Sequence, residues 1–318
     1  MPQHKAIIDG PLQARVEDIP EINAVFSDSF TDRYRRDGLV GVRVPHLNER
    51  VWRYAIDDAA DGAMTWRDGT GKLAAFSMVH RSGGEGWMGP LAVRPDLQGS
   101  GLGKRIVQAG IDWLRQGGAS VIGLETMPRT VENIGFYSRL GFLPQPLTVT
   151  LMRGAVPGSG PRSALLSEES DATAAIAECR LLTQGLGVAA DYTRELQLTA
   201  RLGLGDASLI RSGPTLRGFA LWHSVSLAEG RSAEELRVLK LAAIDVEALR
   251  LTIDGLLVEA TRLGLERVAV RCQTAYEEAY GLLIEAGFHV QWTDLRMTLA
   301  GFGEPALRQG LVLSNWEI

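Results

Sequence analysis

A glycine-rich segment from Val93 to Lys104 constrains the fold of this chain more than any other feature. It lies between an extended apolar run, Trp87 to Val93, and a stretch with helical periodicity, Gly101 to Gln116. Its three glycines, at alternate positions, let the backbone turn several N–H groups toward a ligand, and the helix that follows adds the positive end of its dipole. The arrangement predicts an anion cradle, most often one for phosphates.

Two familiar phosphate-binding loops fit this segment poorly. A P-loop needs a Ser or Thr where Arg105 stands and a glycine where Gln98 stands, so we exclude it. The dinucleotide fingerprint matches Gly99 and Gly101 but misplaces its third glycine by one position, and several strands precede this loop. An oxidoreductase on a dinucleotide fold is kept as an alternative, and it predicts nicotinamide binding.

The pattern Q-x-x-G-x-G, here Gln98, Gly101 and Gly103, closely resembles the acyl-coenzyme A pyrophosphate loop of the GNAT superfamily of N-acetyltransferases. A second segment, Asn133 to Phe142, resembles that family's following helix, with Tyr137 inside it and Gly-Phe at its end. Together the two motifs are specific, and the resemblance covers residues 10 to 153. The resemblance extends over residues 163 to 300 in outline.

The resemblance implies an α/β fold in which two tandem domains each have a mixed, largely antiparallel sheet flanked by helices. It implies acetyl-CoA as co-substrate, a strand Trp87 to Val93 that donates an N–H near Leu91 to the thioester oxygen, and Tyr137 as the acid that protonates the coenzyme thiolate. The implied coenzyme-binding residues are Leu91, Ala92, Val93, Gln98, Gly99, Ser100, Gly101, Leu102, Gly103, Lys104, Asn133, Phe136 and Tyr137.

The general base is the least defined part of this site. Family members often place a glutamate on the splayed strand, but the run WMGPLAV contains no acid. Glu125 on the neighbouring strand is the first candidate, with Glu85 and His80 behind it, and a water relay without one essential base is an open alternative.

The remainder of the first half reads as a mixture of helices and strands. The runs 63–68 and 72–81 predict a hairpin, and residues 12–18 an opening strand. Helices are expected from Asp18, at 46–56 and at 131–140, and a strand at 121–127.

The second half repeats this order after a Gly- and Pro-rich stretch, Gly154 to Ser163, that reads as a linker. A strand at 235–244, a helix at 246–263, a strand at 267–272 and a helix ending at Gly287-Phe288 match the first copy. We therefore expect a catalytic domain at 1–153, a linker at 154–163, a degenerate domain at 164–300, and a tail at 301–318 that docks on one of the domains.

The second copy lacks the residues that would bind coenzyme. Asp245 and Glu247 occupy the segment that matches the glycine loop, and two carboxylates there would repel a pyrophosphate. Leu283 stands at the position of Tyr137, and Ala279 at that of Asn133. This half is predicted to buttress the first and to supply part of the acceptor pocket or a dimer surface.

Composition narrows the possible partners. A net charge of −5 argues against binding nucleic acid electrostatically, and the absence of an 18-residue apolar run or a signal peptide predicts a cytoplasmic protein without a membrane partner. Cys179 and Cys272 have no metal-ligand spacing, so we expect buried free thiols and no metal site.

The resemblance, taken with these patterns, implies transfer of an acetyl group from acetyl-CoA to the amine of a small molecule, with a homodimer as an open possibility. The rival hypothesis is an acyl-CoA-sensing protein that keeps the loop and lacks turnover, for which the missing base residue is the best support.

Overall fold

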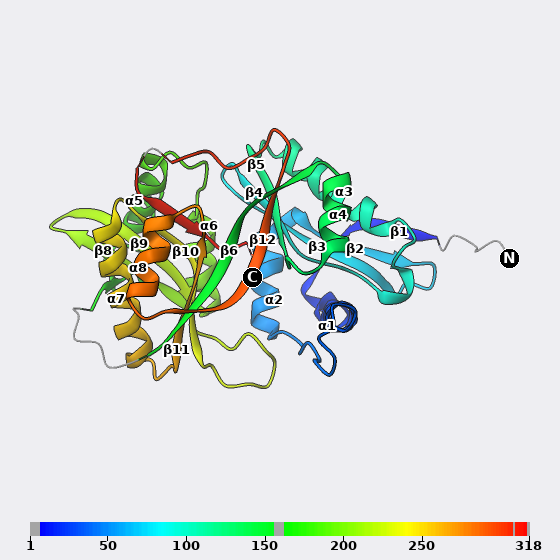
Figure 1. The fold of residues 1–318 in the computed structure, drawn as a ribbon, viewed down its shortest axis with the longest axis horizontal. Helices are drawn as coiled ribbons and strands as arrows, with labels where there is room; N and C mark the ends of the chain where they lie inside the picture. Colours follow the sequence, from blue (N-terminus) through cyan, green and yellow to red (C-terminus); the bar gives the residue numbers. More distant parts are fainter. Residues whose placement is uncertain (1–6, 156–161, 308, 317–318) are drawn as a thin grey trace.

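One mixed sheet of 13 strands runs through the computed structural model, which describes residues 7–155, 162–307 and 309–316. The strand order is β1-β2-β3-β4-β5-β12-β6-β11-β10-β9-β8-β7, with β13 paired to β10. Two neighbouring pairs, β4 with β5 and β10 with β11, are parallel, and the other pairs are antiparallel. Figure 1 shows the two halves side by side along the long axis.

The first half begins with strand β1 and ends with strand β6. Its elements are β1 (Ile8–Gln13), α1 (Ile19–Arg36), α2 (Glu49–Ala59), β2 (Ala63–Asp68), β3 (Leu73–Ser82), β4 (Glu85–Val93), α3 (Leu102–Gln116), β5 (Val121–Thr126), α4 (Val131–Arg139) and β6 (Phe142–Gly154). The expected hairpin is confirmed, because β2 and β3 pair antiparallel.

The opening strand lies earlier than expected. Strand β1 covers Ile8–Gln13, and Val16–Asp18 form a short 3-10 turn, so the prediction of a strand over 12–18 is wrong for most of its length. Gly10-Pro11 obscures the strand in the sequence, since proline cannot donate to a ladder. The chain accommodates the proline in a register shift between Asp9 and Leu12 on an edge strand.

The second half repeats the order of the first, as predicted. Its elements are β7 (Ala164–Leu165), α5 (Ala172–Gly185), α6 (Thr193–Leu202), β8 (Gly205–Ser212), β9 (Thr215–His223), β10 (Glu235–Ala243), α7 (Val246–Arg262), β11 (Arg267–Gln273), α8 (Glu277–Glu285), β12 (His289–Leu299) and β13 (Leu311–Ser314). Most of the predicted linker, residues 156–161, lies outside the described residues, and the domain limits stay predictions.

The last strand of each repeat is shared with the other half. Strand β11 pairs along its whole length with the second half of β6, whereas β12 pairs with β5. The two strands also pair with each other, and Figure 1 shows them crossing together between the halves. Each half therefore completes its sheet with a strand from the other repeat.

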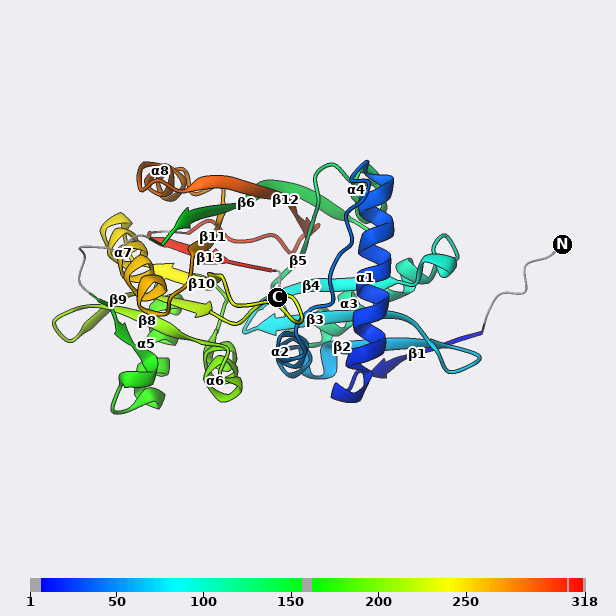
Figure 2. The same ribbon diagram turned by 90° about the horizontal axis from the view of Figure 1, so that it is seen from below.

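Helices cover both faces of the sheet in the first half. Helices α1 and α2 pack with Phe76, Met78 and Ala92 in one core, while α3 and α4 pack with Val79 and Met88 in another. Figure 2 shows α1 lying across the strands on its face. The alternation of β3 thus places the successive residues Met78 and Val79 on opposite faces of the sheet.

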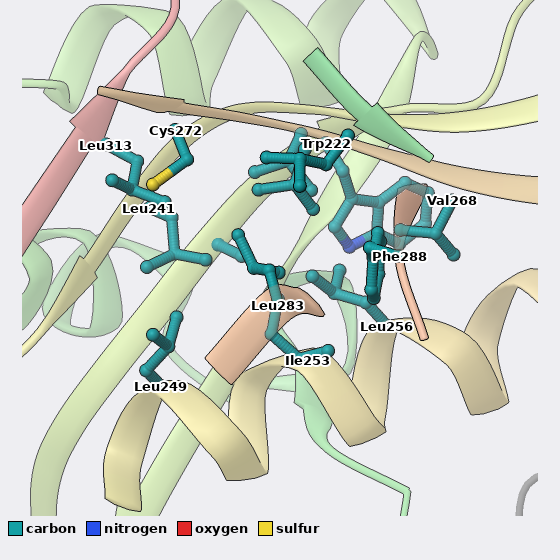
Figure 3. Packing of buried hydrophobic residues seen from close by; sticks show 14 of the residues in the cluster. Trp222, Leu241, Leu249, Ile253, Leu256, Val268, Cys272, Leu283, Phe288 and Leu313 are labelled. Carbon is teal, nitrogen blue, oxygen red and sulfur yellow. The ribbon is translucent and has the colours of Figure 1, made fainter. Parts of the chain in front are cut away.

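Helix α7 forms the main core of the second half with α8 and strands β9 to β11. Leu249, Ile253 and Leu256 of α7 point toward Leu241 and Leu283, as Figure 3 shows. These side chains are at most 1% exposed, so the second copy has kept a packed apolar centre.

The carboxy-terminal tail is docked, as expected. Strand β13 pairs with β10, and the Trp316 side chain is buried against Trp87 and Val121 of the first half. The tail therefore spans from the second half to the strands that carry the candidate site.

Candidate active site

Strands β4 and β5 open into a wedge beside the glycine loop. They pair in parallel from Glu85 to Met88 and then part, while β4 continues beside β3 to Val93. A register shift between Ser77 and Val79 of β3 lies opposite Gly89-Pro90, which confirms the irregularity that this dipeptide indicated in the sequence. Leu91, Ala92 and Val93 thus form one side of the wedge.

The glycine loop connects the open end of β4 to helix α3. Gly99 and Gly101 have φ values of 77° and 88°, in the left-handed region that favours glycine. No described atom lies within 4 Å of a Cβ placed on either residue, so the outer side of the loop is open. Gly101 is the N-cap of α3, and the first N–H groups of a helix have no intrahelical partner. The loop therefore has the form of an anion cradle.

Several loop residues contribute through the backbone or by holding the loop. The Gln98 side chain donates from Nε2 to the carbonyl oxygen of Val93 at 3.1 Å, which ties the loop to the strand end. The Ser100 hydroxyl donates to the Leu97 carbonyl oxygen at 2.6 Å. Leu102 is buried in an apolar cluster, so its side chain anchors α3, whereas Lys104 is exposed.

Helix α4 brings the second motif to the wedge. Phe136 lies 3.6 Å from the position of a Cβ on Gly103, and its ring packs 5.1 Å from that of Tyr137. Tyr137 and Leu91 belong to the same apolar cluster, and Asn133 is half-buried one turn earlier. Burial raises the pKa of Tyr137 to about 12. The structure thus brings together the strand, the loop and the helix that the two motifs indicated.

Glu125 is in the wall of the wedge but is held by buried arginines. Its carboxylate accepts from Arg271 at 2.7 Å and Arg296 at 3.0 Å, both from the second half, and from the Thr148 hydroxyl at 2.5 Å. Burial opposes its ionisation, yet these charges and hydrogen bonds hold the pKa of Glu125 below its ordinary value. This environment disfavours Glu125 as the general base, because its lone pairs are engaged and its basicity is reduced.

Glu85 is enclosed in the same way. It accepts from Tyr192 at 2.8 Å, from Ser314 at 2.7 Å and from the Trp316 indole at 2.5 Å. Burial opposes its ionisation, but the charge of Lys240 and these donors keep the pKa of Glu85 lowered. Neither carboxylate faces the wedge as a free base.

The arginines around Glu125 were missed by the sequence reasoning. Arg271 and Arg296 lie 146 and 171 positions further along the chain. Arg271 also pairs with Asp294 at 3.0 Å, and Arg296 with Glu304 at 2.8 Å. Only the shared strands bring these residues beside β5, and no local pattern signals that pairing.

The matching helix end in the second half is already occupied. The Asp245 carboxylate caps α7 by accepting from the Ala248 N–H at 2.8 Å, and it pairs with Arg217 at 2.5 Å. Leu283, at the position of Tyr137, is fully buried in the core of Figure 3. The second copy therefore presents a self-capped helix where the first presents an open loop.

The two cysteines, Cys179 and Cys272, are buried free thiols, and burial raises the pKa of each to about 12. Among the described residues, no group of three or more His, Cys, Asp or Glu side chains is arranged to hold a metal ion. No described helix has the length and apolarity needed to cross a membrane.

Comparison with known proteins agrees with this geometry. Residues 23–142 match the model of the acetyltransferase (GNAT) family. This chain is 35% identical over 72 residues to the ribosomal protein bS18-alanine N-acetyltransferase of Escherichia coli, covering 23% of this chain and 49% of that protein. An uncharacterized N-acetyltransferase of Pyropia yezoensis is also 35% identical, over 81 residues that cover 25% of this chain and 45% of that protein. The chain thus spans about half the length of the curated relatives it matches.

Solved structures share the fold of the whole chain. A protein from Pyrococcus horikoshii assigned as an acetyltransferase superposes with a TM-score of 0.66 at 15% identity, covering 99% of this chain and 96% of its own. A tandem GNAT protein from the clavulanic acid biosynthesis pathway has a TM-score of 0.59 at 12% identity, over 94% of this chain and 100% of its own. Residues 23–142 of this chain therefore resemble the GNAT acetyltransferase family, and the whole chain has the fold of a tandem GNAT protein.

Proposed function

We propose that this protein transfers an acetyl group from acetyl-CoA to a primary amine of a small molecule, at a single coenzyme site in its amino-terminal half. The observation that carries the proposal is the open glycine loop at the start of α3, beside the wedge between β4 and β5. Left-handed glycines and free helix N–H groups suit a diphosphate, and an additional Cβ on either glycine would enter that space.

The residues around the wedge suit the remaining chemistry of acyl transfer. A main-chain N–H near Leu91 would stabilise the negative charge that develops on the thioester oxygen. Tyr137 would supply the proton that the departing thiolate needs, and its apolar surroundings with Phe136 exclude water from that step. Ala92, Val93 and Asn133 would line the path of the pantetheine arm.

The second half is proposed to complete this site without binding coenzyme. Arg296 and Trp316 reach the strands of the wedge, and the Trp316 carbonyl oxygen lies 3.6 Å from the position of a Cβ on Gly89. Asp245 at the matching helix end supports a structural role for the second copy.

The test is release of free thiol from acetyl-CoA with a panel of acceptors. The panel contains small primary amines and, because one relative is named for acetylating an alanine of a ribosomal protein, a peptide that begins with alanine. Turnover with a small amine supports the proposal, and turnover confined to the peptide would replace a small molecule by a protein as acceptor. Calorimetry with CoA should give one site per chain, and two sites of similar affinity would contradict the assignment of the second half.

An acyl-CoA sensor is the second candidate. The observation that favours it is the enclosure of both Glu125 and Glu85, which removes the nearest carboxylates from the role of base. Tight binding of CoA with no thiol release across the panel would support the sensor. The dinucleotide-fold alternative is wrong, because the described strands form a mainly antiparallel sheet of GNAT type rather than a doubly wound parallel one.

A further inference from the structure

A buried histidine lies near the wedge with one ring nitrogen unused. His80 on β3 is 2% exposed, and its Nδ1 lies 2.6 Å from the Oδ2 atom of Asp58 on α2. Its other nitrogen, Nε2, is buried and has no hydrogen-bond partner among the described residues. Buried polar atoms in native proteins are nearly always paired, so this one calls for an explanation.

The contacts of Asp58 determine which nitrogen of His80 has the proton. Asp58 also accepts from Arg194 at 2.9 Å, and burial, which opposes ionisation, is outweighed by His80 and Arg194, so the pKa of Asp58 is lowered. An ionised carboxylate can only accept hydrogen bonds, so Nδ1 of His80 must donate to it. In the neutral ring this leaves the lone pair of Nε2 available.

His80 is one of the residues that line a small cavity. A cavity of about 10 Å³ is lined by His80, Asp58, Trp87, Lys240 and Asn315, together with neighbouring apolar atoms. That volume is close to the minimum for one water. A water in this cavity could hydrogen-bond to His80 and to the polar groups that line it. The imidazole ring stacks on the ring of Trp87, with the ring centroids 5.2 Å apart.

The cavity is adjacent to the wedge. His80 is the cross-strand partner of Trp87, which precedes Gly89 by two residues, or about 7 Å at the rise of a β-strand. On the other side, Asn315 precedes Trp316, whose carbonyl oxygen approaches Gly89. The cavity and the open end of β4 thus share the segment Asn315–Trp316.

The titratable groups near His80 come from three elements besides its own. Asp58 of α2 contacts the ring, and Tyr54 of α2 and Lys240 of β10 line the same cavity. On α6, Arg194 pairs with Asp58, and burial and the charge of Asp58 raise the pKa of Glu195 well above its ordinary value. Lys240 is stacked 4.0 Å over Trp87 and donates to Ser314 and Asn315.

We infer that His80, oriented by Asp58, is the proton acceptor of the transfer reaction and takes the proton of the attacking amine through one water in this cavity. The inference rests on the proposed function. As the amine nitrogen bonds to the carbonyl carbon and the C–S bond breaks, the amine proton passes to the water, and a proton of that water passes to Nε2. The thiolate receives the Tyr137 proton, and solvent returns a proton from His80 to Tyr137, so the residues end unchanged.

The experiment measures kcat/KM against pH for thiol release, with the small amine that gives the fastest turnover in the panel. In the wild-type protein the rate should fall at low pH, because a protonated base cannot take the proton of the amine. The variant His80→Gln should lose this acid limb and about 10²- to 10⁴-fold in kcat/KM, while retaining CoA binding by calorimetry.

His223→Gln is the matched control. His223 is also 2% exposed in the sheet, but its Nε2 is paired with Thr199 at 2.9 Å in the second half. This variant should keep the acid limb. Since the chain has only five histidines, the ¹⁵N spectrum of the wild-type protein labelled with ¹⁵N-histidine gives a readout that does not depend on a variant folding. The His80 ring should have its proton on Nδ1 and none on Nε2.

The outcomes distinguish failure of the proposed function from failure of the proton relay. If the wild-type protein shows no turnover on any acceptor, both the proposed function and this relay are overturned. If it turns over but His80→Gln keeps the acid limb, or the His80 ring has its proton on Nε2, the relay is overturned and the transferase assignment stands.

Discussion

Tyr137 illustrates how far single residues can be assigned from the motif. The helix segment identified it, and the structure encloses its phenol between Phe136 and Phe142 with Leu91 nearby. A tyrosine in such apolar surroundings keeps its proton at neutral pH, so it is available to donate that proton to a thiolate formed next to it.

Replacement of Tyr137 by Phe should lower kcat about 10- to 1,000-fold, because the thiolate loses its proton donor, while the affinity for CoA stays nearly the same. Steady-state kinetics and calorimetry check both quantities. Tyr276→Phe is the control, since burial also raises the pKa of Tyr276 to about 12 but this residue lies in the second half. An unchanged kcat in Tyr137→Phe would remove the residue from the mechanism.

Glu125 shows what the sequence does not contain. Its position on β5 made it a reasonable base, but its partners Arg271 and Arg296 are contributed by strands of the other repeat. Side-chain chemistry at such a site depends on long-range pairing, and one sequence contains no local trace of it.

Glu125 should make the protein sensitive to acid. Its pKa is lowered in the folded state, so its contribution to stability is present above the ordinary value of about 4.3 and is lost as the pH falls below it. Glu125→Gln should lower the free energy of unfolding by about 3–5 kcal/mol at pH 7, by leaving Arg271 and Arg296 without their anion, and should weaken its dependence on pH below 5.

Urea unfolding from pH 3 to 7 measures both effects. Glu266→Gln is the control. The Glu266 side chain is exposed, and its ion pair with Arg267 is long, at 3.7 Å, so the substitution should change the free energy of unfolding by less than about 1 kcal/mol. Equal effects of the two substitutions would contradict the account of the buried cluster.

At the scale of elements, the starts of α3 and α7 are the decisive contrast. One helix begins at Gly101 behind an open loop, and the other begins at Asp245, whose side chain fills the cap. The open start of α3 and the capped start of α7 could both be predicted from the sequence, because glycine and aspartate at an N-cap have opposite effects on an incoming anion.

Gly101→Val should weaken CoA binding about 10- to 100-fold, the loss expected when one or two charge-assisted hydrogen bonds are blocked. Gly118→Val is a matched control. Gly118 has a φ of 74°, and no described atom lies within 4 Å of a Cβ there, but it follows the other end of α3. The control should have the same backbone strain with normal CoA affinity, which calorimetry measures. Equal losses in both variants would assign the effect to strain.

Most elements with a regular apolar period were predicted within a few residues of their limits. Helix α3 and strand β10 are examples, since the expected stretches 101–116 and 235–244 became 102–116 and 235–243. The exchange of β6 and β12 was not predicted, because either strand has the pattern to pair with either half. The sheet edge that each strand joins depends on contacts across the whole chain and not on its own sequence pattern.

At the scale of the molecule, the exchange makes the two halves dependent on each other. Strand β12 covers the edge of β5, and β6 continues the sheet into β11. Buried ion pairs such as Arg271–Glu125 lie on the same seam.

A fragment that ends at residue 155 should therefore not behave as an independent folded domain. It would have β6 without β11 and an uncovered β5 edge, and exposed edges promote association. Size-exclusion chromatography should show dimers or aggregates, and calorimetry should show CoA binding below that of the full chain. A monomer that unfolds cooperatively and binds CoA with full affinity would contradict this prediction.

The separation of β5 and β12 in the sequence also delays the completion of the sheet during synthesis. Strand β5 ends at Thr126, whereas β12 begins at His289. At 5–20 residues per second, a ribosome needs about 8 to 30 s to make the intervening chain. Throughout that delay the nascent polypeptide carries an unfinished sheet, so either a chaperone or a provisional partnership of β6 with β5 has to shield it before the final strand emerges.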